Sequence, residues 1–556
     1  MRRYRGYITA LVAAGLVGFV VGFLLGLRDW SSGWPGLSAL RALRIGAQGW
    51  LAGVVISPGL GWSLSRRAPS VPFSRRGYRG VLGAALTVLG LVPAFLWLPG
   101  AIHLGAMHKA SAIGRQPGDG RPNLILITID ALRADHLGAY GSSRGLTPNL
   151  DAFAAEATRY DAAYVSSPWT LTSLGTLFTG LPPSQSGLKT LSPDGHSWYM
   201  GYAKLPESRT LLSEQLQRAG YATAADVTNV FLESDRGWKR GFDYFRNEGG
   251  ADGNLSEQAH ARTLTEHSAA WLRLNWRQPF FLWVHYLDPH CPYESPETPR
   301  ELRARYPAHW VARRDRWYYG LKSAPADKRA RYQQFCREMY AEEVRYVDRW
   351  VGELLKGLKA ARMYESSLIV ITADHGEELF DHGGLDHGQN MHEEVLSVPL
   401  LLRWPVGTAA DKRITQTVAM KSLAGTLLVL AQAPALNGVE QALPQRDGGT
   451  PSEVYSEGLL YGKEQTALTT DDYRVVYRAY ESTEGERFEV YDRRKDRRER
   501  HNLASSGAAS ELRLRLRRLT QAATAAARTG GGESDRELRL SEGAERKMRS
   551  LGYLAK

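Results

Sequence analysis

The chain has 556 residues, 43% of them hydrophobic, which is enough for several domains with sizeable cores. Its net charge is +12, but residues 1–121 hold 14 Lys and Arg against 2 Asp and Glu. Subtracting these from the totals of 70 and 58 leaves 56 of each sign, so the rest of the chain is neutral. This balance argues against a nucleic-acid-binding surface. Two cysteines, Cys291 and Cys336, exclude a cysteine-rich metal site and are expected to be free, buried thiols.

The N-terminal part contains three apolar stretches, each close to the length that crosses a bilayer. We therefore predict a transmembrane anchor of about three helices in residues 1–104, followed by a linker in 105–121. A cleaved signal peptide is the alternative for the first stretch, but no small-residue cleavage site follows it. The stretches are residues 7–27, 45–64 and 80–102.

Arginines flank these stretches unevenly, which indicates an orientation. Arg2, Arg3 and Arg5 precede the first stretch, and residues 66–79 between the second and third contain five more arginines. With three spans both groups lie in the cytoplasm, and the catalytic domain is predicted outside it, in the periplasm or on the cell surface. The second stretch is the weakest because it contains Pro58; without it the catalytic domain would be cytoplasmic.

The next segment alternates between apolar strand patterns and helical patterns. Residues 123–129, 280–286 and 367–371 are near-continuous apolar runs, as expected of strands buried on both faces. A helix is expected to begin near 147–149, where Pro148 suits a first turn. We predict an α/β catalytic domain over 122–406, with a mostly parallel sheet covered by helices on both faces.

The C-terminal part differs in character. Shorter strand patterns at 453–456, 473–480 and 487–491 predict a small antiparallel sheet in a subdomain of residues 407–505, with the last two strands paired as a hairpin. Residues 506–556 form a predicted helical tail, with one helix over 510–528.

Polar residues follow the predicted strands directly. Asp130 follows the first, and Asp374 and His375 follow the third. Ligands bind at the carboxyl ends of strands in such sheets, and carboxylates with imidazoles are ligands for a dication. A helix-capping Asp beside a structural His is the alternative for Asp374 and His375.

These segments, in this order, resemble the sulfatase family, within the alkaline-phosphatase-like superfamily of metal-dependent hydrolases and transferases. The resemblance extends from about residue 122 to the C-terminus. The resembling segments are residues 123–135, 147–151, 170–180, 288–293, 374–378, 386–388, 398–400, 403–405, 490–503 and 551–554.

The resemblance implies roles for eight residues. One divalent metal (Mn, Zn or Ca) is expected to be held by the metal-site residues. His290 and His387 occupy positions of substrate-binding and catalytic residues. His285 is a weaker candidate for substrate binding, and Asn229 is either a substrate contact or a turn-forming residue. The metal-site residues are Asp130, Thr170, Asp374 and His375.

Two departures from the family pattern change the expected chemistry. Typical sulfatases carry Cys or Ser, oxidised to formylglycine, where this chain has Thr170, and an arginine where it has Leu174. Threonine cannot become formylglycine, so no formylglycine-generating enzyme is expected as a partner; a cation can instead activate its hydroxyl as a nucleophile. Ala131 replaces a second Asp that many sulfatases carry, and the missing carboxylate favours Mn²⁺ or Zn²⁺ over Ca²⁺.

We therefore predict a metal-dependent hydrolase or transferase that cleaves phosphate or sulfate esters through a covalent Thr170 intermediate. A sulfatase proper, acting on sulfuric esters, is the first alternative. A catalytically inactive envelope protein that retains the fold is the second; the intact set of metal-site residues argues against it, and Leu174 in the arginine position keeps it open. The substrate is expected to be a small-molecule, lipid-headgroup or glycan ester, and the membrane is an expected partner.

Overall fold

The structure is a computed structural model, and it describes residues 120–188, 203–247, 261–274, 279–439, 441–478 and 487–529. Two compact units divide the chain, Met1–Ala112 and Ile113–Lys556, and every described residue belongs to the second. The three stretches predicted as membrane spans lie outside the described residues. In the described part, no helix combines the length and apolar character needed to cross a membrane.

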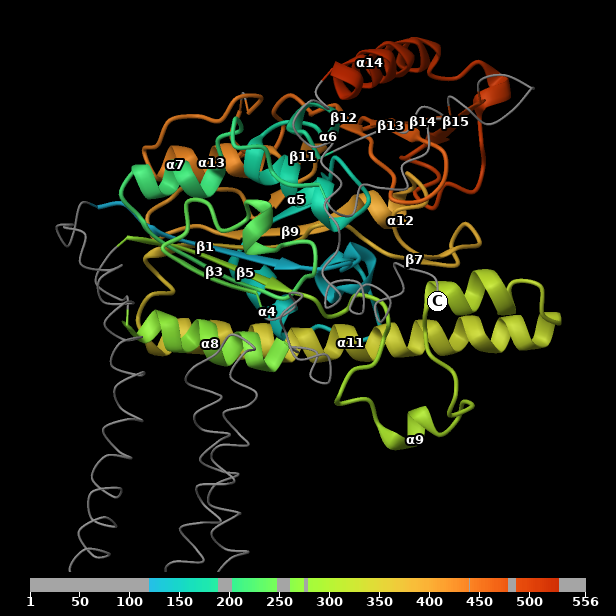
Figure 1. Cartoon of the computed structure of the whole chain (residues 1–556), viewed down its shortest axis with the longest axis horizontal. Helices are drawn as coiled ribbons and strands as arrows, with labels where there is room; N and C mark the ends of the chain where they lie inside the picture. The colour runs from blue at the N-terminus through green and yellow to red at the C-terminus, as the bar shows by residue number, and fades with distance from the viewer. Residues whose placement is uncertain are drawn as a thin grey trace, which may run out of the picture. The chain divides into compact units, whose positions relative to one another are not determined.

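A nine-stranded sheet forms the centre of the described structure (Figure 1). Its order is β10-β2-β9-β6-β1-β5-β3-β4, with β11 also paired to β2. Neighbouring strands are parallel except where β9 pairs with β2 and with β6. The strands are β1 (Asn123–Ile129), β2 (Thr158–Tyr164), β3 (Ala222–Val227), β4 (Tyr244–Asn247), β5 (Phe280–Tyr286), β6 (Ser367–Ala373), β9 (Ser397–Arg403), β10 (Arg413–Ile414) and β11 (Val418–Ala419).

The central strands form where the sequence is most continuously apolar. All side chains of β5 and β6 are buried, as are those of β1 after Asn123, because helices cover both faces of a parallel sheet. In the register of the sheet, Ile129 lies opposite both Tyr286 and Ala373. These three strands therefore end at one level, and the residues that follow them share one edge of the sheet.

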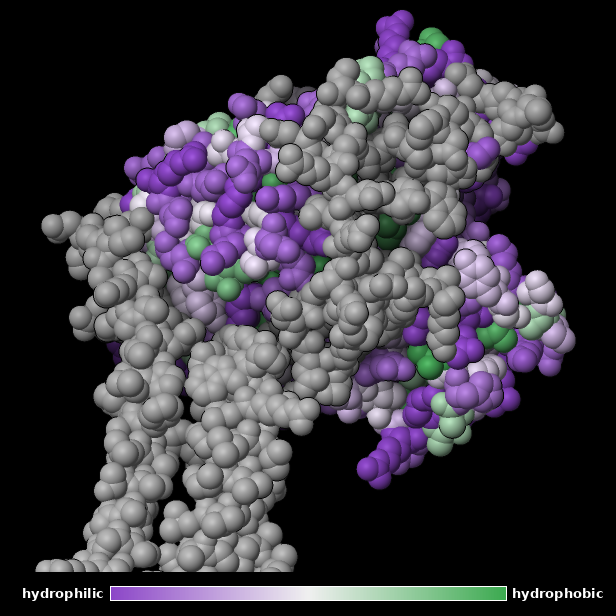
Figure 2. All heavy atoms as spheres, in the orientation of Figure 1, coloured by the Kyte–Doolittle hydropathy of each residue, from purple (hydrophilic) through white to green (hydrophobic). Residues whose placement is uncertain are grey.

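Two layers of helices enclose this sheet. On one face lie α4, α8 and α11, with α11 in contact with the other two, and on the other lie α5, α7 and α13 (Figure 1). Hydrophilic side chains cover much of the described surface in the view of Figure 2. The predicted mostly parallel α/β architecture with helices on both faces is confirmed. The helices are α4 (Pro148–Glu156), α5 (Thr170–Thr179), α7 (Leu212–Arg218), α8 (Ala261–Leu274), α11 (Ala326–Ala360) and α13 (Ser422–Leu430).

A second sheet is small and antiparallel, in the order β12-β13-β14-β15. The predicted pairing of its last two strands is confirmed, and helix α14 packs on it around a core that includes Leu468, Val475 and Leu516. The large sheet continues past residue 406, since β10 and β11 pair with β2. The elements of the small sheet are β12 (Val454–Ser456), β13 (Gln465–Thr469), β14 (Tyr473–Arg478), β15 (Arg487–Asp492) and α14 (Ser510–Thr529).

Short elements form the loops at the carboxyl edge of the large sheet. The hairpin of β7 and β8 follows β6, and a short helix α10 leads into a π-helical turn, η6, before α11. Cys291 and Cys336 are both buried free thiols, as predicted. The remaining short elements are η2 (Ala134–His136), η3 (Gly138–Tyr140), α6 (Pro183–Ser186), η5 (Ser234–Arg236), α9 (Arg300–Arg303), α10 (Arg314–Arg316), η6 (Trp317–Leu321), β7 (Glu378–Leu379), β8 (Leu385–Asp386), α12 (Glu393–Leu396) and η7 (Ala504–Ser506).

Candidate metal centre and active site

The four residues predicted to hold a metal meet at the carboxyl edge of the large sheet. Asp130 follows β1, Asp374 and His375 follow β6, and Thr170 is the first residue of α5. The Nε2 atom of His375 lies 3.2 Å from the Thr170 Oγ, 3.3 Å from Asp130 Oδ1 and 3.5 Å from Asp374 Oδ2. All four side chains are buried. The parallel register of β1 and β6 thus places these donors around one point.

The hydrogen bonds of His375 fix which ring nitrogen faces this point. Its Nδ1 lies 2.8 Å from the carbonyl oxygen of Gly376. A carbonyl oxygen only accepts, so Nδ1 carries the proton and donates it. The lone pair of Nε2 is then directed at Asp130, Asp374 and Thr170, which is the usual arrangement of a metal-binding histidine.

The two carboxylates leave buried oxygens that a cation would satisfy. Among the described residues, no hydrogen-bond donor reaches Asp130 Oδ1 or Asp374 Oδ2. Burial opposes the charge of Asp130, but His290, His285 and His375 outweigh it and hold its pKa well below the usual range. Burial and the charge of Asp130 raise the pKa of Asp374. A dication fits this site, and two carboxylates, an imidazole and a hydroxyl are donors that suit Mn²⁺ or Zn²⁺.

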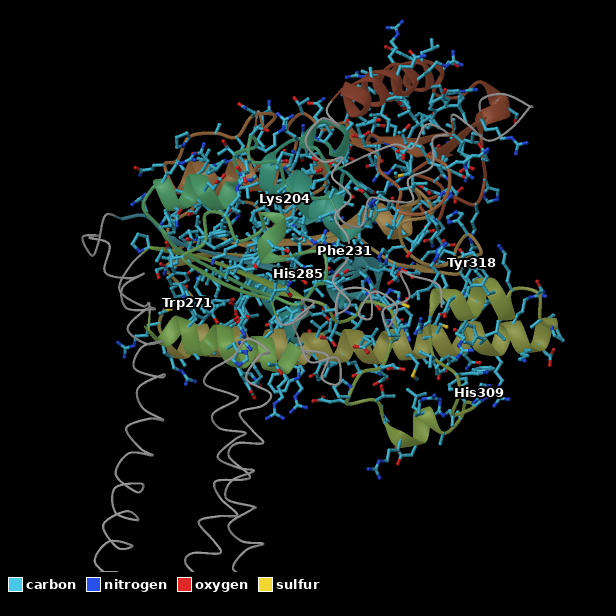
Figure 3. The ribbon with its side chains drawn as sticks, viewed as in Figure 1. Lys204, Phe231, Trp271, His285, His309 and Tyr318 are labelled. Atoms are coloured by element: carbon cyan, nitrogen blue, oxygen red, sulfur yellow. The ribbon has the colours of Figure 1, made fainter. Side chains whose placement is uncertain are left out.

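Asn229 and His285, predicted to bind substrate, both lie against Asp130. The Asn229 amide Nδ2 donates to Asp130 Oδ2 at 2.7 Å, and His285 Nε2 lies 3.4 Å from the same oxygen. The other ring nitrogen of His285 lies 2.8 Å from Thr128 Oγ. Figure 3 labels His285 beside Phe231, whose backbone N–H donates to Asn229 Oδ1 at 2.9 Å. In this arrangement both residues orient the Asp130 carboxylate.

His387 and His290 extend the site as a row of rings beside His375. The ring centroids of His375 and His387 are 4.2 Å apart, and those of His387 and His290 are 4.9 Å apart. Burial opposes protonation of His387, but Asp386 and Glu377 outweigh it and raise its pKa well above the usual value. Burial dominates at His290 and lowers its pKa to about 4. The three residues predicted as catalytic, Thr170, His290 and His387, therefore lie in one buried cluster.

Two carboxylates that the sequence interpretation left without a role hold His387. Its Nδ1 lies 2.9 Å from Asp386 Oδ1 and 3.2 Å from Glu377 Oε1. Asp386 adopts a left-handed backbone, with φ of 84°, and its carboxylate also accepts the backbone N–H of His387 at 2.8 Å. Burial raises the pKa of Glu377 to about 7. The only sequence signal for this pair was its position within the resembling segments.

Besides Thr170, two positions depart from the family pattern, Ala131 and Leu174. Ala131 has a left-handed backbone, with φ of 59°, and its N–H donates to Asp374 Oδ1 at 3.3 Å. Leu174 is buried in the first half of α5 and brings no charge to the site. Any positive charge beyond the histidines must therefore come from another segment.

Comparisons with known proteins agree with this site and fold. The chain is 23% identical to an uncharacterized sulfatase, YidJ, of Escherichia coli, over 71% of this chain and 86% of that protein. It is 24% identical to arylsulfatase K of Gallus gallus, over 68% of this chain and 79% of that protein. A protein solved in complex with its substrate D-glucosamine-2-N,6-O-disulfate shares the fold, with a TM-score of 0.58 and 19% identity, over 75% of this chain and all of that one.

A protein-family model called Sulfatase matches residues 122–433, which is more than half of the chain. The matched range contains all the site residues described above. The chain therefore belongs to the sulfatase family of hydrolases.

Proposed function

We propose that this chain is a metal-dependent hydrolase of anionic esters that uses the Thr170 hydroxyl as its nucleophile. The observation that carries the proposal is the position of the Thr170 Oγ, 3.2 Å from His375 Nε2 and 3.4 Å from Asp130 Oδ2. The Thr170 hydroxyl therefore lies among the side-chain atoms that would bind the metal. A threonine whose only role was to begin α5 would not need its hydroxyl in this position.

Asp130, Thr170, Asp374 and His375 would hold the metal. A dication bound there lowers the pKa of a coordinated hydroxyl and offsets negative charge on the group being transferred. Thr170 lies at the N-terminus of α5, whose free backbone N–H groups favour an anion at the same place. The Thr170 hydroxyl releases its proton to solvent, its oxygen attacks the sulfur or phosphorus atom, and the bond to the leaving alcohol oxygen breaks.

The paired histidines suit the two proton transfers that follow. His387 is held by two carboxylates, which favour its protonated form, so it can donate a proton to the leaving oxygen. His290 donates its Nδ1 proton to the Cys291 carbonyl and has a lowered pKa, so it is neutral and can accept a proton from water. That water then attacks the group on Thr170 and restores the free hydroxyl.

The comparisons favour a sulfate ester as the substrate, which the sequence alone gave only as an alternative. The family model and both relatives named above are sulfatases. The structural neighbour acts on a sulfated sugar, which supports a glycan as the organic part of the ester. We therefore propose sulfate esters of a glycan as the first candidate substrates.

Thr170 itself supports a second candidate, a phosphate ester. Threonine cannot be converted to formylglycine, whereas its hydroxyl is well suited as a nucleophile that attacks phosphorus. If an acceptor hydroxyl replaced water in the second step, the same site would act as a transferase. A membrane-attached enzyme with its active site outside the cytoplasm remains the proposal for its location, based on the N-terminal apolar stretches.

Turnover by the full-length protein on aryl sulfate, phosphomonoester and phosphodiester tests these proposals together. Each substrate is offered with Mn²⁺, Zn²⁺, Ca²⁺ or a chelator, to wild type, Thr170→Ala and Thr170→Ser. Metal-dependent sulfate cleavage that Thr170→Ala abolishes and Thr170→Ser retains is the expected result. Phosphate-only cleavage with the same dependence on Thr170 selects the second candidate. Cleavage that survives in Thr170→Ala overturns the nucleophile, and absent turnover without metal binding supports an inactive protein.

A further inference from the structure

The guanidinium of Arg314 lies near Asp386, the carboxylate that holds the proposed catalytic residue His387. Arg314, in α10, is partly exposed, and in the described part of the chain it forms no ion pair within 4.0 Å. Its Nη1 is buried and has no hydrogen-bond acceptor there. The nearby Asp386 carboxylate is already occupied by His387. A partly buried charge in this state favours a ligand that brings an anion.

Two aromatic rings hold the Arg314 guanidinium in place. Its Cζ lies 3.8 Å from the centroid of the Tyr461 ring and 4.5 Å from that of Tyr318. Cation–π contacts of this kind fix a guanidinium while leaving its N–H groups available for an anion. Figure 3 labels Tyr318, which projects near β7, at the end of the molecule where α11 begins.

Hydrogen bonds join the segments around Arg314 to the loops next to His387 and His290. The Tyr461 backbone N–H donates to the Gly388 carbonyl at 2.9 Å, directly after His387. The Trp317 indole donates to the Gly383 carbonyl at 3.2 Å, in the loop between β7 and β8. On the other side, the Cys291 thiol, next to His290, donates to the Ala312 carbonyl at 3.2 Å. These bonds hold the Arg314 segment in place relative to the active site. The active site itself has Leu174 where typical sulfatases carry an arginine.

We propose that Arg314 determines specificity by binding a second anionic group of the substrate, separate from the ester that is cleaved. The substrate class is then an ester whose organic part also carries a carboxylate, sulfate or phosphate. This inference rests on the proposed ester hydrolysis at Thr170. It adds a binding site beside the catalytic cluster, supplied by α10, η6 and the loop before β13.

The test compares two substrates, a para-nitrophenyl ester and the same ester with a carboxylate on the ring, using the full-length protein. Arg314→Gln is expected to lower kcat/KM for the carboxylated ester about tenfold more than for the parent, mainly through KM, as for the loss of one charged hydrogen bond. Arg314→Lys keeps the charge and should retain part of the preference. Arg316→Gln is the matched control, because Arg316 is an exposed arginine of the same short helix. This variant should change kcat/KM for neither ester.

A binding measurement separates this inference from the proposed function. The carboxylated and parent nitrophenols are titrated calorimetrically into Thr170→Ala, with and without Arg314→Gln. Tighter binding of the carboxylated compound that depends on Arg314 supports the site even if wild type cleaves neither ester. Equal losses on both esters, or no loss on either, overturn it. If Arg314→Gln fails to fold, Arg314→Ala and Tyr318→Leu are used in its place. The proposed role of Arg314 is overturned if both variants keep the full preference for the carboxylated ester over the parent ester.

Discussion

Thr170 and His375 are 205 residues apart in the chain, yet the Thr170 Oγ lies 3.2 Å from His375 Nε2. The contact joins the first residue of α5 to the second residue after the end of β6. It exists because α5 packs on one face of the sheet with its N-terminus at the edge where β1 and β6 end. The proposed nucleophile and a proposed metal ligand are thereby brought to one point by a helix and a strand.

Removal of one carboxylate is expected to abolish tight metal binding. Asp374→Asn should weaken Mn²⁺ or Zn²⁺ binding by at least about tenfold, because one of the two carboxylate donors becomes a neutral amide. Calorimetric titration of the full-length protein measures it, and wild type should also gain thermal stability on metal addition. Asp235→Asn, at an exposed position, is the control. Unchanged affinity in Asp374→Asn would place the metal elsewhere.

The carboxylates on His387 are expected to act through the ring that they hold. Asp386→Asn should lower kcat about 100-fold with little change in KM, because an amide no longer favours the protonated imidazole. Asn also tolerates the left-handed backbone at this position, so the fold should be preserved. Kinetics of the single and double variants check the mechanism. In a His387→Ala background, Asp386→Asn should have no further effect, and an additive loss would contradict the role.

Helix α4 receives its N-terminal cap from another helix. Asp348 in α11 accepts the backbone N–H of Leu150 at 2.8 Å, and its other oxygen accepts the backbone and side-chain N–H groups of Asn149 at 3.2 and 2.8 Å. Asp348→Ala should therefore lower the free energy of unfolding by about 3 kcal/mol, from three lost hydrogen bonds. Denaturant unfolding measures it. Glu353→Ala, exposed on the same helix, should change stability by less than about 0.5 kcal/mol.

The hydrogen bond between His382 and Glu394 makes the stability of the fold depend on pH. Burial opposes the charge of His382, but its hydrogen bond to Glu394 outweighs this and raises the pKa of His382 to about 9 from 6.5. Because the folded pKa is the higher one, the stabilisation is complete below about pH 6.5 and is lost as pH rises through about 9. His382 is partly exposed, so screening reduces the contribution to about 1 kcal/mol.

Thermal unfolding of wild type and His382→Gln at several pH values tests this contribution. The difference in Tm should be largest at about pH 6 and should disappear near pH 10. Glu394→Gln should show the same pattern, since it removes the hydrogen-bond partner. A difference that stays constant over this range would show that His382 stabilises by packing on His392, whose ring lies 3.7 Å away.

Several features of the site followed from sequence alone. The runs at 123–129 and 280–286 correspond to β1 and β5 residue for residue, and β6 extends the predicted 367–371 by two residues. Long apolar runs leave few alternatives to a strand buried on both faces. Polar residues directly after such strands must then lie at one edge of the sheet, so the grouping of Asp130 with Asp374 and His375 was predictable.

Other features depended on loops whose course no local pattern predicts. Glu377 reaches His387 only because the β7–β8 hairpin folds the chain back. Arg314 meets Tyr461 across 147 positions, through a short helix and a loop that have no periodic signal. Asn229 and His285 were expected at the substrate, but the packing of β3 and β5 directs both at Asp130.

The sequence by itself determined the three central strands β1, β5 and β6, the family, and the grouping of the proposed metal donors at one edge of the sheet, because burial on two faces and the chemistry of strand ends act locally. Only the tertiary structure decided which carboxylates hold His387 and which guanidinium lies near one of them, Asp386. Those contacts join residues from separate loops, and their geometry depends on packing against the whole sheet rather than on the residues next to them in the chain.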